Sequence, residues 1–324
     1  MRRPQVVLTG GTGFIGSRVL HRLLDPEPTG HPVEVRALAR TEQRSSAAPR
    51  LSWVPADLTR PASLDGVGED ADVLIHLAAR ISGSEAECAA VNVHGTTALL
   101  EEARRRGVGR IIQLSTAAVY GPGPHRGITV NEVAPAPVSP ASRTRLAGER
   151  VAVDAGATVL RPGLVTGAGD RWVVPALADL REQLPVRWNG GKGLASMVDV
   201  DDLARLIVRL ATMPDGPPSG IFHASHPRPV RNRDLMTTLA DLGVLPPAPA
   251  EDRSWEACLE HLRRSPHGVS ERQFELLAGD HWYDSDDIWR IAERPAGPGP
   301  LARLSAASPW YATHLAERRR APRA

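Results

Sequence analysis

The sequence predicts an α/β fold in which a doubly wound parallel sheet is followed by a smaller, mainly helical C-terminal part. Short apolar runs rich in β-branched residues alternate with stretches whose apolar residues recur at helical spacing. Strands that alternate with helices imply right-handed crossovers and therefore a parallel sheet. Hydrophobic residues make up 42% of the 324-residue chain, which is enough for one large domain with an elaboration, or for two domains.

The first half of the chain carries the regular alternation. The helices that we expect there cover 13–24, 85–106 and 140–155. The expected strands are 5–9, 33–39, 51–55, 72–79, 110–116 and 157–162.

From about residue 163 the regular alternation of predicted strands and helices ends. An amphipathic helix is predicted at 198–213, with Asp201 or Asp202 near its start, where a carboxylate suits the helix dipole. Residues 244–252 form a proline-rich connector rather than a flexible linker. The other elements expected in this half are a strand at 220–225, helices at 231–243, 254–264 and 269–278, and a last segment at 280–293.

Composition excludes several classes of function. The net charge is only +2, with acidic and basic residues interspersed, so neither nucleic acid nor an anionic membrane is an expected partner. Cys88 and Cys258 stand apart and show neither a disulfide framework nor metal-ligand spacing. No apolar run is long enough for a signal peptide or a membrane span, so we expect a cytoplasmic protein. The basic run 318–320 is expected to be a solvated tail.

The stretch TGGTGFIG, residues 9–16, joins the first predicted strand to the first helix. Gly10 permits a tight turn, Gly13 lets a pyrophosphate approach the backbone, and Gly16 lets the helix pack on the sheet. The helix N-terminus adds amide donors for an anion. This context predicts a dinucleotide site, and further contacts are expected from Thr12, Phe14 and Ile15.

The second strand indicates which dinucleotide is bound. An acidic residue at the tip of this strand binds the ribose diol and selects NAD. Here the strand ends in RALARTEQR, with Arg36, Arg40 and Arg44 and no carboxylate at its tip. Because a guanidinium suits a 2′-phosphate, we expect NADPH/NADP+, with Arg40 as the leading contact. Arg36 is either a second contact or a strand residue that faces solvent.

From residue 5 to about 293 the chain resembles the extended short-chain dehydrogenase/reductases, whose catalytic part is a Rossmann-type sheet. Each shared motif alone is weak evidence for the resemblance, but the whole set of motifs in this order is specific for the family. The motifs are TGGTGFIG, PADL (55–58), IHLAA (75–79), NVHGT (92–96), LSTAAVYG (114–121), LRPGLVTG (160–167), VDVDDLA (198–204) and the late segment 280–295.

The resemblance implies roles for individual residues. Asn92 would support the active site, and Thr116 stands where the family carries its catalytic Ser or Thr. The implied cofactor contacts are Asp57 and Leu58 at the adenine, Ala78 and Ala79 at the nicotinamide side, Thr116, and the loop Pro162, Gly163, Leu164 and Val165. Residues 1–165 would then bind NADP(H) and 166–324 the substrate, with 196–225 returning to the first part.

The chain departs from the family at its catalytic signature. The positions that would carry the tyrosine and lysine of Tyr-x-x-x-Lys hold Ala141 and Arg145. The only tyrosines are Tyr120, Tyr283 and Tyr311 and the only lysine is Lys192, so the motif exists nowhere in the chain. A positioned general acid contributes about 10²–10⁴ in rate.

Three explanations compete. In the first, the protein is a reductase in which Thr116 binds the carbonyl oxygen and Arg145 supplies positive field. The proton then comes from a phenol or enol of the substrate, or from His261, His267 or His281. In the second, the protein binds NADP(H) without turnover as a redox sensor. In the third, it is a structural subunit that keeps the fold and cofactor for stability.

We favour the reductase, because Thr116 and Asn92 remain. A helical lid near 250–293, carrying Trp255, His267, Trp282 and Trp289, could cover a large flat substrate, although each tryptophan could equally fill a small core. The expected substrate contacts are Ser82, Ser84, Tyr120, Ala141 and Trp282.

The expected function is therefore reduction of a bulky polycyclic ketone by NADPH. The chain has 38 arginines against one lysine. In this arginine bias and in its broken signature it is similar in kind to the atypical, angucyclinone- or simocyclinone-type polyketide ketoreductases of actinomycete antibiotic pathways. Reduction of a nucleotide-sugar or an enone stays open, as do the monomeric and homodimeric states. We expect no metal.

Overall fold

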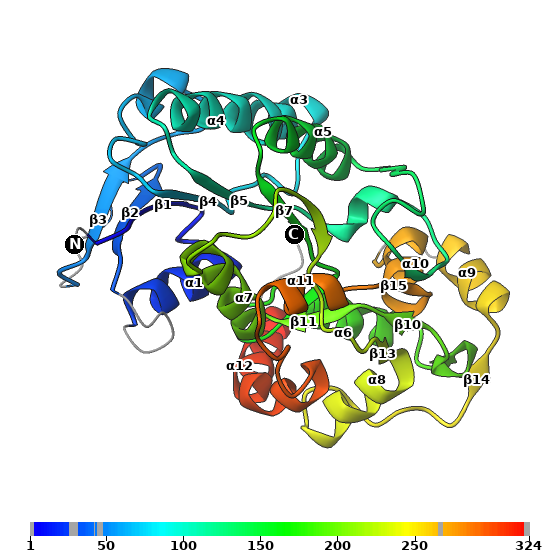
Figure 1. The fold of residues 1–324 in the computed structure, drawn as a ribbon. Helices are drawn as coiled ribbons and strands as arrows, with labels where there is room; N and C mark the ends of the chain where they lie inside the picture. Colours follow the sequence, from blue (N-terminus) through cyan, green and yellow to red (C-terminus); the bar gives the residue numbers. More distant parts are fainter. Residues whose placement is uncertain (1–2, 26–31, 42, 44–47, 265–267, 321–324) are drawn as a thin grey trace.

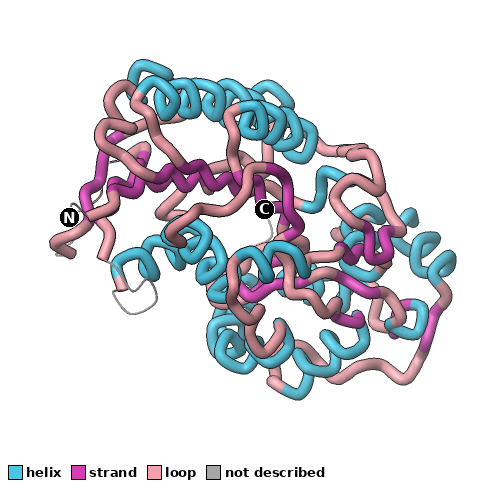
Figure 2. Tube along the Cα trace, in the orientation of Figure 1, coloured by secondary structure: helices cyan, strands magenta, loops and turns pink. Residues whose placement is uncertain are grey.

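The computed structural model describes residues 3–25, 32–41, 43, 48–264 and 268–320. Within these residues the main sheet is parallel and has seven strands in the order β12-β7-β5-β4-β1-β2-β3 (Figures 1 and 2). The predicted doubly wound parallel sheet is confirmed. The strands are β1 (Gln5–Thr9), β2 (Glu34–Ala39), β3 (Leu51–Pro55), β4 (Val73–His76), β5 (Arg110–Leu114), β7 (Thr158–Arg161) and β12 (Gly220–His223).

Helices cover both faces of this sheet. One face carries α3 (Glu85–Ala89), the π-helical turn η2 (Ala90–Gly95), α4 (Thr96–Arg105) and α5 (Pro140–Asp154); the other carries α1 (Phe14–Leu24) and α7 (Val200–Thr212) (Figure 1). The predicted helix at 85–106 is therefore present, but a π-turn interrupts it. Helix α7 is capped by Asp199, whose side chain accepts from the Asp201 amide at 2.9 Å.

The C-terminal part holds more β structure than its sequence pattern predicts. Its four-stranded sheet has the order β13-β10-β15-β6. These strands are β6 (His125–Ile128), β10 (Leu194–Ala195), β13 (Val230–Arg231) and β15 (His281–Tyr283), and two short pairs join β8 (Leu164–Thr166) to β11 (Met197–Asp199) and β9 (Arg187–Trp188) to β14 (Asp252–Arg253). Strands of two to four residues leave too little alternation to be recognised in the sequence.

Helices enclose this smaller part, which lies to the lower right in Figure 1. They are α6 (Val173–Gln183), α8 (Asn232–Asp241), α9 (Trp255–Arg264), α10 (Glu271–Ala278), α11 (Asp286–Ile291) and α12 (Pro300–Arg320). The run 318–320 is exposed, as expected, but it is the last turn of α12 rather than a tail. There Arg318 and Arg319 pair with Asp179 at 2.8 Å and Glu182 at 3.4 Å.

Among the tryptophans of the expected lid, Trp289 is a correction. Trp255 packs on Phe274, with ring centroids 4.6 Å apart, in the C-terminal core. Trp289 is buried in the core beneath the main sheet and donates to the Ser225 carbonyl at 2.7 Å. Trp289 therefore fills a core and cannot stack on a substrate, whereas Trp255 is half-buried and its contact with substrate stays a prediction. His267 lies outside the described residues.

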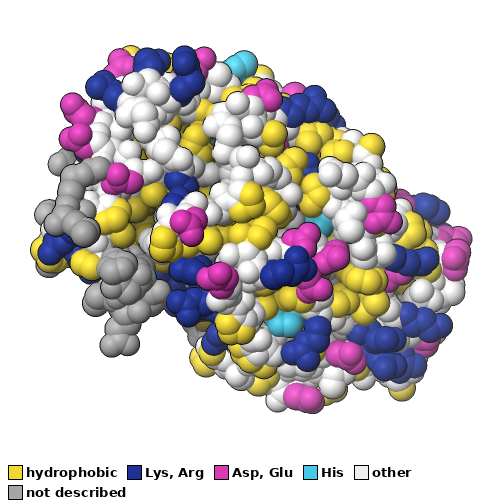
Figure 3. All heavy atoms as spheres, in the orientation of Figure 1, with side chains coloured by type: hydrophobic (Ala, Val, Ile, Leu, Met, Phe, Trp, Pro, Cys, Tyr) yellow, Lys and Arg dark blue, Asp and Glu magenta, His cyan; other side chains and the backbone are white. Residues whose placement is uncertain are grey.

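The surface has no dominant sign of charge. Figure 3 shows acidic and basic side chains interspersed over the face in view, as a net charge of +2 leads one to expect. Among the described residues, no helix combines the length and apolar character needed to cross a bilayer.

Helix α5 approaches the π-turn closely because it carries a glycine at the crossing. A Cβ added to Gly148 would lie 2.2 Å from the Asn92 carbonyl oxygen, far inside van der Waals contact. A larger residue here must push α5 away from η2 and disturb Asn92.

We therefore expect Gly148→Ala to lower the free energy of unfolding by about 2 kcal/mol, as overpacking of a tight contact typically does. The alanine's better helix propensity offsets only part of this cost. The control is Gly109→Ala, because the nearest atom to its added Cβ is 4.0 Å away. Chemical denaturation of both variants measures the effect, and equal stability of the two would contradict this account of the crossing.

Candidate cofactor and active site

The glycine loop has the geometry of a dinucleotide cradle. Gly10 has φ +74°, and a Cβ on it would lie 2.8 Å from the Ala78 amide nitrogen. A Cβ on Gly16 would lie 1.9 Å from the Gly10 carbonyl oxygen. Helix α1 begins after Gly13 without a side-chain cap, so its first amides remain for an anion. The loop therefore fits a pyrophosphate, and Thr12, Phe14 and Ile15 lie on it as expected.

Arg36 in β2 and Arg40 directly after it have side chains in different surroundings. Arg40 is exposed at the carboxyl end of the strand, and its charge helps to lower the pKa of Asp57, although the Thr59 amide hydrogen bond is the larger cause. Arg36 is half-buried and donates to the Val67 and Glu69 carbonyls at 2.7 and 2.9 Å. Because this loop leads into the amino end of β4, Arg36 points to the opposite edge of the sheet. The expectation that it contacts the cofactor is corrected.

A small polar cavity lies behind the position expected for the nicotinamide. It has a volume of about 10 Å³, enough for about one water. His76 lies on its wall, 2.7 Å from Thr9 Oγ1 and 3.0 Å from Thr96 Oγ1. Its lining residues are His76, Ala78, Ala79, Asn92, Thr96, Gln113, Leu114, Ser115 and Arg145. The structure thus brings together four of the predicted site residues: Ala78, Ala79, Asn92 and Arg145.

Asn92 holds the loop after β4 against helix α5. Its Oδ1 accepts from the Arg80 amide at 2.8 Å, and its Nδ2 donates to the Arg80 carbonyl at 2.8 Å and to Thr144 Oγ1 at 3.0 Å. All of these contacts are to protein groups, so Asn92 acts as a positioning residue that fixes Ala78 and Ala79 relative to α5.

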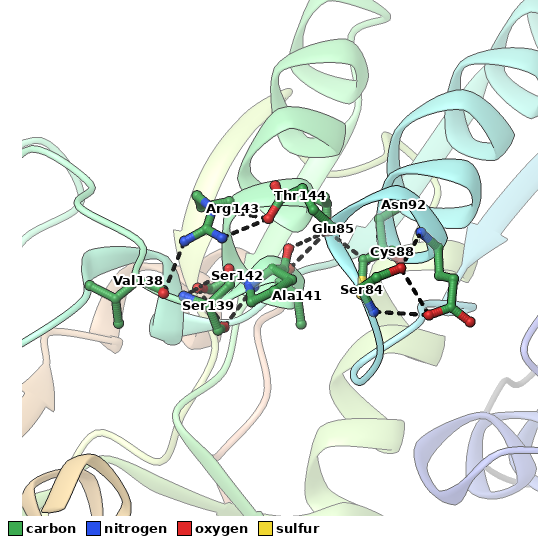
Figure 4. A network of polar contacts seen from close by, with 12 residues as sticks. Ser84, Glu85, Cys88, Asn92, Val138, Ser139, Ala141, Ser142, Arg143 and Thr144 are labelled. Carbon is green, nitrogen blue, oxygen red and sulfur yellow. Dashed lines mark hydrogen bonds and ion pairs between the residues drawn. The ribbon is translucent and has the colours of Figure 1, made fainter.

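Ala141 lies in the first turn of α5, between the helix cap and the start of α3 (Figure 4). Ser139 and Ser142 cap each other's backbone amides, at 3.0 and 3.1 Å. The Thr144 hydroxyl donates to the Pro140 carbonyl at 2.7 Å and contacts the Ala141 carbonyl at 3.2 Å. The alanine thus stands on a well-ordered turn, without a hydroxyl of its own.

Thr116 follows the end of β5, and Arg145 of helix α5 contacts the last residue of that strand. Thr116 Oγ1 accepts from the Ala118 amide at 3.2 Å, which leaves its hydroxyl proton free to be donated. Arg145 donates to the Leu114 carbonyl at 3.0 Å. Burial lowers the pKa of Arg145 to about 10, and Glu149 opposes this, so the guanidinium remains a cation near neutral pH.

Tyr120 is a second correction, because it cannot contact a substrate. It is 1% exposed, and burial raises its pKa. Its hydroxyl accepts from Arg161 at 2.9 Å and lies 2.7 Å from His223 Nε2. His223 Nδ1 is 2.9 Å from the Asp284 carbonyl, to which it must donate, so Nε2 accepts the tyrosine proton.

The other tyrosines are also held away from the site. Tyr283 is buried and stacks on Tyr120, with centroids 5.4 Å apart. The Tyr311 hydroxyl donates to Asp170 at 3.0 Å and accepts from the Gly167 amide at 2.8 Å. No tyrosine of this chain is therefore free to act as the missing acid. His281 is buried too, and burial lowers its pKa to about 4, so its ring is neutral and a poor proton donor.

The remaining expected contacts are placed as follows. Ser82 and Ser84 are exposed on the loop after β4, and Ser84 also caps α3 through Glu87. Trp282 is half-buried in β15, where its ring lies 2.4 Å from a Cβ added to Gly127. Their contact with substrate stays a prediction, as it does for Ala141.

His261, a candidate proton donor, is half-buried on α9. The cofactor loop 162–165 packs tightly, since Gly163 has no room for a Cβ beside the Ser196 carbonyl at 2.2 Å.

Sequence reasoning missed the buried ion pair of Arg161 and Glu149, which are 2.5 Å apart. Glu149 also accepts a short hydrogen bond from Ser115. The available signal was an arginine inside the otherwise apolar strand VLRP, because a buried charge requires a partner.

The model of the NAD-dependent epimerase/dehydratase family matches residues 6–224. The chain belongs to this family. The matched range begins with β1 and its glycine loop and ends just beyond β12, so it includes every strand of the main sheet.

Among curated relatives, the chain is 29% identical over 247 residues to the 4-hydroxy-2-methyl-3-oxo-4-farnesyl-3,4-dihydroquinoline-1-oxide ketoreductase of Stigmatella aurantiaca, which covers 72% of each chain. It is 26% identical over 339 residues to a dTDP-glucose 4,6-dehydratase of Streptomyces antibioticus, which covers 93% of this chain and 99% of that protein.

Among solved structures, the fold is similar to the dTDP-glucose 4,6-dehydratase DesIV of Streptomyces venezuelae with bound NAD, at a TM-score of 0.72 and 24% identity over 97% of this chain and 98% of that chain. UDP-glucuronic acid 4-epimerase of Bacillus cereus in complex with NAD has a TM-score of 0.71 at 17% identity, over 96% and 99%. Proteins similar to this chain thus include a ketoreductase, dehydratases and an epimerase.

Buried histidines make the stability of the protein depend on pH. Burial lowers the pKa of His76, His223 and His281 to about 4 each, so the unfolded chain takes up protons at a pH where the folded chain does not. Stability is therefore lost as pH falls from about 6.5 towards 4. Asp199 opposes this, because burial raises its pKa to about 6 and the folded state gains stability as that group protonates.

Burial also lowers the pKa of His125 and raises that of Asp170, which leaves four histidines against two aspartates. We therefore expect the free energy of unfolding to be at least about 2 kcal/mol lower at about pH 5 than at about pH 7.5. Denaturation at the two pH values measures this. His281→Gln should flatten the dependence, whereas the same change at the exposed His21 should leave it unaltered. An undiminished loss in the His281 variant would refute the assignment.

Proposed function

We propose that the protein is an NADPH-dependent ketoreductase that acts on a bulky, polycyclic ketone without a tyrosine acid. The observation that carries the proposal is the state of Thr116. Its hydroxyl accepts a hydrogen bond from the Ala118 amide, so its proton is available for donation to a substrate. The hydroxyls of Tyr120 and Tyr311, in contrast, form hydrogen bonds inside the protein, and Tyr283 is buried. A ketoreductase among the similar proteins supports the same reaction class.

When bound, a reduced nicotinamide supplies the hydride. The chain's own residues then have to orient the ketone and stabilise the negative charge that develops on its oxygen. Thr116 donates its hydroxyl proton in a hydrogen bond to that oxygen, and the Arg145 cation, fixed by the Leu114 carbonyl, adds positive field from inside the fold. Asn92 keeps the loop of Ala78 and Ala79 in place.

The proton does not come from arginine, which stays charged, nor from neutral His281. A phenol or enol beside the ketone of the substrate can deliver it within the same molecule. This requirement favours an aromatic hydroxyketone, in which carbonyl and acidic hydroxyl are neighbours. Reduction of a nucleotide-sugar would need another donor.

The first experiment is deuteride transfer from deuterated NADPH to a panel of polycyclic hydroxyketones, read by mass spectrometry. A gain of one deuterium in the product supports the reductase.

Thr116→Val should lower turnover about a hundredfold, as loss of one such donor typically does, with NADPH affinity kept. Thr97→Val is the control, because that hydroxyl bonds the Val93 carbonyl within the helix. Tight NADPH binding without transfer across the panel would favour a redox sensor instead.

Arg40 determines the choice of dinucleotide in this proposal. We expect Arg40→Glu to weaken NADPH binding about tenfold or more and NADH binding little, because only NADPH presents a phosphate to the guanidinium. Arg3→Glu reverses the same charge at the opposite edge of the sheet, where Arg3 pairs with Glu34, and should alter neither affinity. Titration of both nucleotides measures the effect, and an equal loss for the two would rule out the 2′-phosphate contact.

A further inference from the structure

Within the described residues four large hydrophobic side chains are exposed, and three of them lie in connections at the carboxyl edge of the main sheet. The four are Ile81, Val138, Val153 and Trp172, with 68%, 43%, 38% and 42% of their surface exposed. We propose that Ile81, Val138 and Trp172 form an apolar rim that receives the flat ring system of the substrate. The proposal rests on the proposed function and names the residues that select the substrate.

The chain topology brings the three rim residues to one edge of the main sheet. Ile81 lies in the loop that leaves β4, Val138 directly precedes α5, and Trp172 follows β8, which continues the chain from β7. All three therefore belong to connections at the carboxyl ends of parallel strands. Ligands of such sheets bind in the crevice outside this edge. Val153, in contrast, lies near the far end of α5.

Trp172 stands on a rigid support. Asp170 accepts from the Trp172 and Val173 amides, both at 2.8 Å, and from the Val174 amide at 3.0 Å. Asp170 is itself held by the Tyr311 hydroxyl at 3.0 Å and is 1% exposed. An indole that is fixed by its backbone and yet 42% exposed retains a large apolar surface for a ligand.

The support also adjoins the cofactor loop. Arg18 donates to the Ala168 carbonyl at 3.2 Å, and a Cβ on Gly169 would lie 2.9 Å from the Phe14 ring. Since Phe14 begins helix α1 directly after Gly13, the segment that carries Trp172 packs against the cradle for the pyrophosphate. The rim is thus continuous with the cofactor site.

Two of the three arginines beside the rim are paired with carboxylates, which favours a ring of low charge over a highly charged substrate. Arg80, next to Ile81, pairs with Glu87 at 2.7 Å. Arg143 pairs with Glu85 at 2.6 Å and donates to the Val138 carbonyl at 2.9 Å (Figure 4). Arg171, exposed beside Trp172, suits an ionised phenol. Indole and aliphatic surfaces stack on fused aromatic rings, so the expected occupant is a polycyclic aromatic hydroxyketone.

The test uses quinizarin, a dihydroxyanthraquinone whose ketone lies beside a phenol, and protein saturated with NADP+ so that no turnover occurs. Binding is followed by the change in the visible absorbance of the dye. Trp172→Ala should weaken quinizarin binding about tenfold, because stacking on the indole is lost. Trp172→Phe should retain most of the affinity, and Ile81→Ser should lose several-fold. The matched control Val153→Ala removes exposed apolar surface outside the rim and should leave binding unchanged.

The affinity for NADP+ is measured alongside and should be the same in all variants. The rim proposal is overturned if Trp172→Ala and Val153→Ala bind alike, or if wild-type protein reduces small ketones but does not bind quinizarin. If quinizarin binds in a Trp172-dependent way while no deuteride is transferred to any hydroxyketone, the rim stands and the reductase proposal fails.

Discussion

The buried ion pair of Arg161 and Glu149 is the contact on which the arrangement of the site depends. It joins β7 to α5, and each partner extends it, Glu149 to Ser115 after β5 and Arg161 to Tyr120 and thence to His223 in β12. Burying two charges is costly, so the pair contributes little net stability when intact. Removing one partner leaves the other unpaired in the interior, which typically costs about 3–5 kcal/mol. The pair therefore constrains the register of these elements more than it stabilises the fold.

This constraint explains what the site retains after the loss of the usual acid. Ser115, next to Thr116, is fixed by Glu149, and Arg145 lies one helical turn before Glu149 on α5. The segments that carry Thr116 and Arg145 are thus both tied to the buried Glu149. Residue 141, at the outer end of α5, can change without disturbing that anchor, because the turn there is held by Ser139, Ser142 and Thr144.

The sequence predicts the main sheet and its glycine loop well, because they depend on local patterns. Strands such as QVVLT are continuous apolar runs, and the spacing of Gly10, Gly13 and Gly16 reports close backbone contacts directly. Arg36 and Tyr120 were misjudged for a different reason. Their partners, at Val67 and at His223, come from segments 31 and 103 residues away, and nothing local encodes such contacts. The tryptophans posed the same difficulty, since an indole in a small core and one in a lid look alike in sequence.

Because Tyr311 supports a segment of the site from a helix late in the chain, assembly of the site depends on the order in which the chain is synthesised. Its hydroxyl reaches Asp170 across 141 residues of chain, from the helix that the described structure ends with. Until α12 has been made, the segment beside Phe14 has its own turn but no outer support. Contacts between such distant residues form late, because the intervening chain must first be ordered. A ribosome-bound chain can therefore build the first strands and the cradle early, while the wall next to the cradle is completed only after α12 has been synthesised.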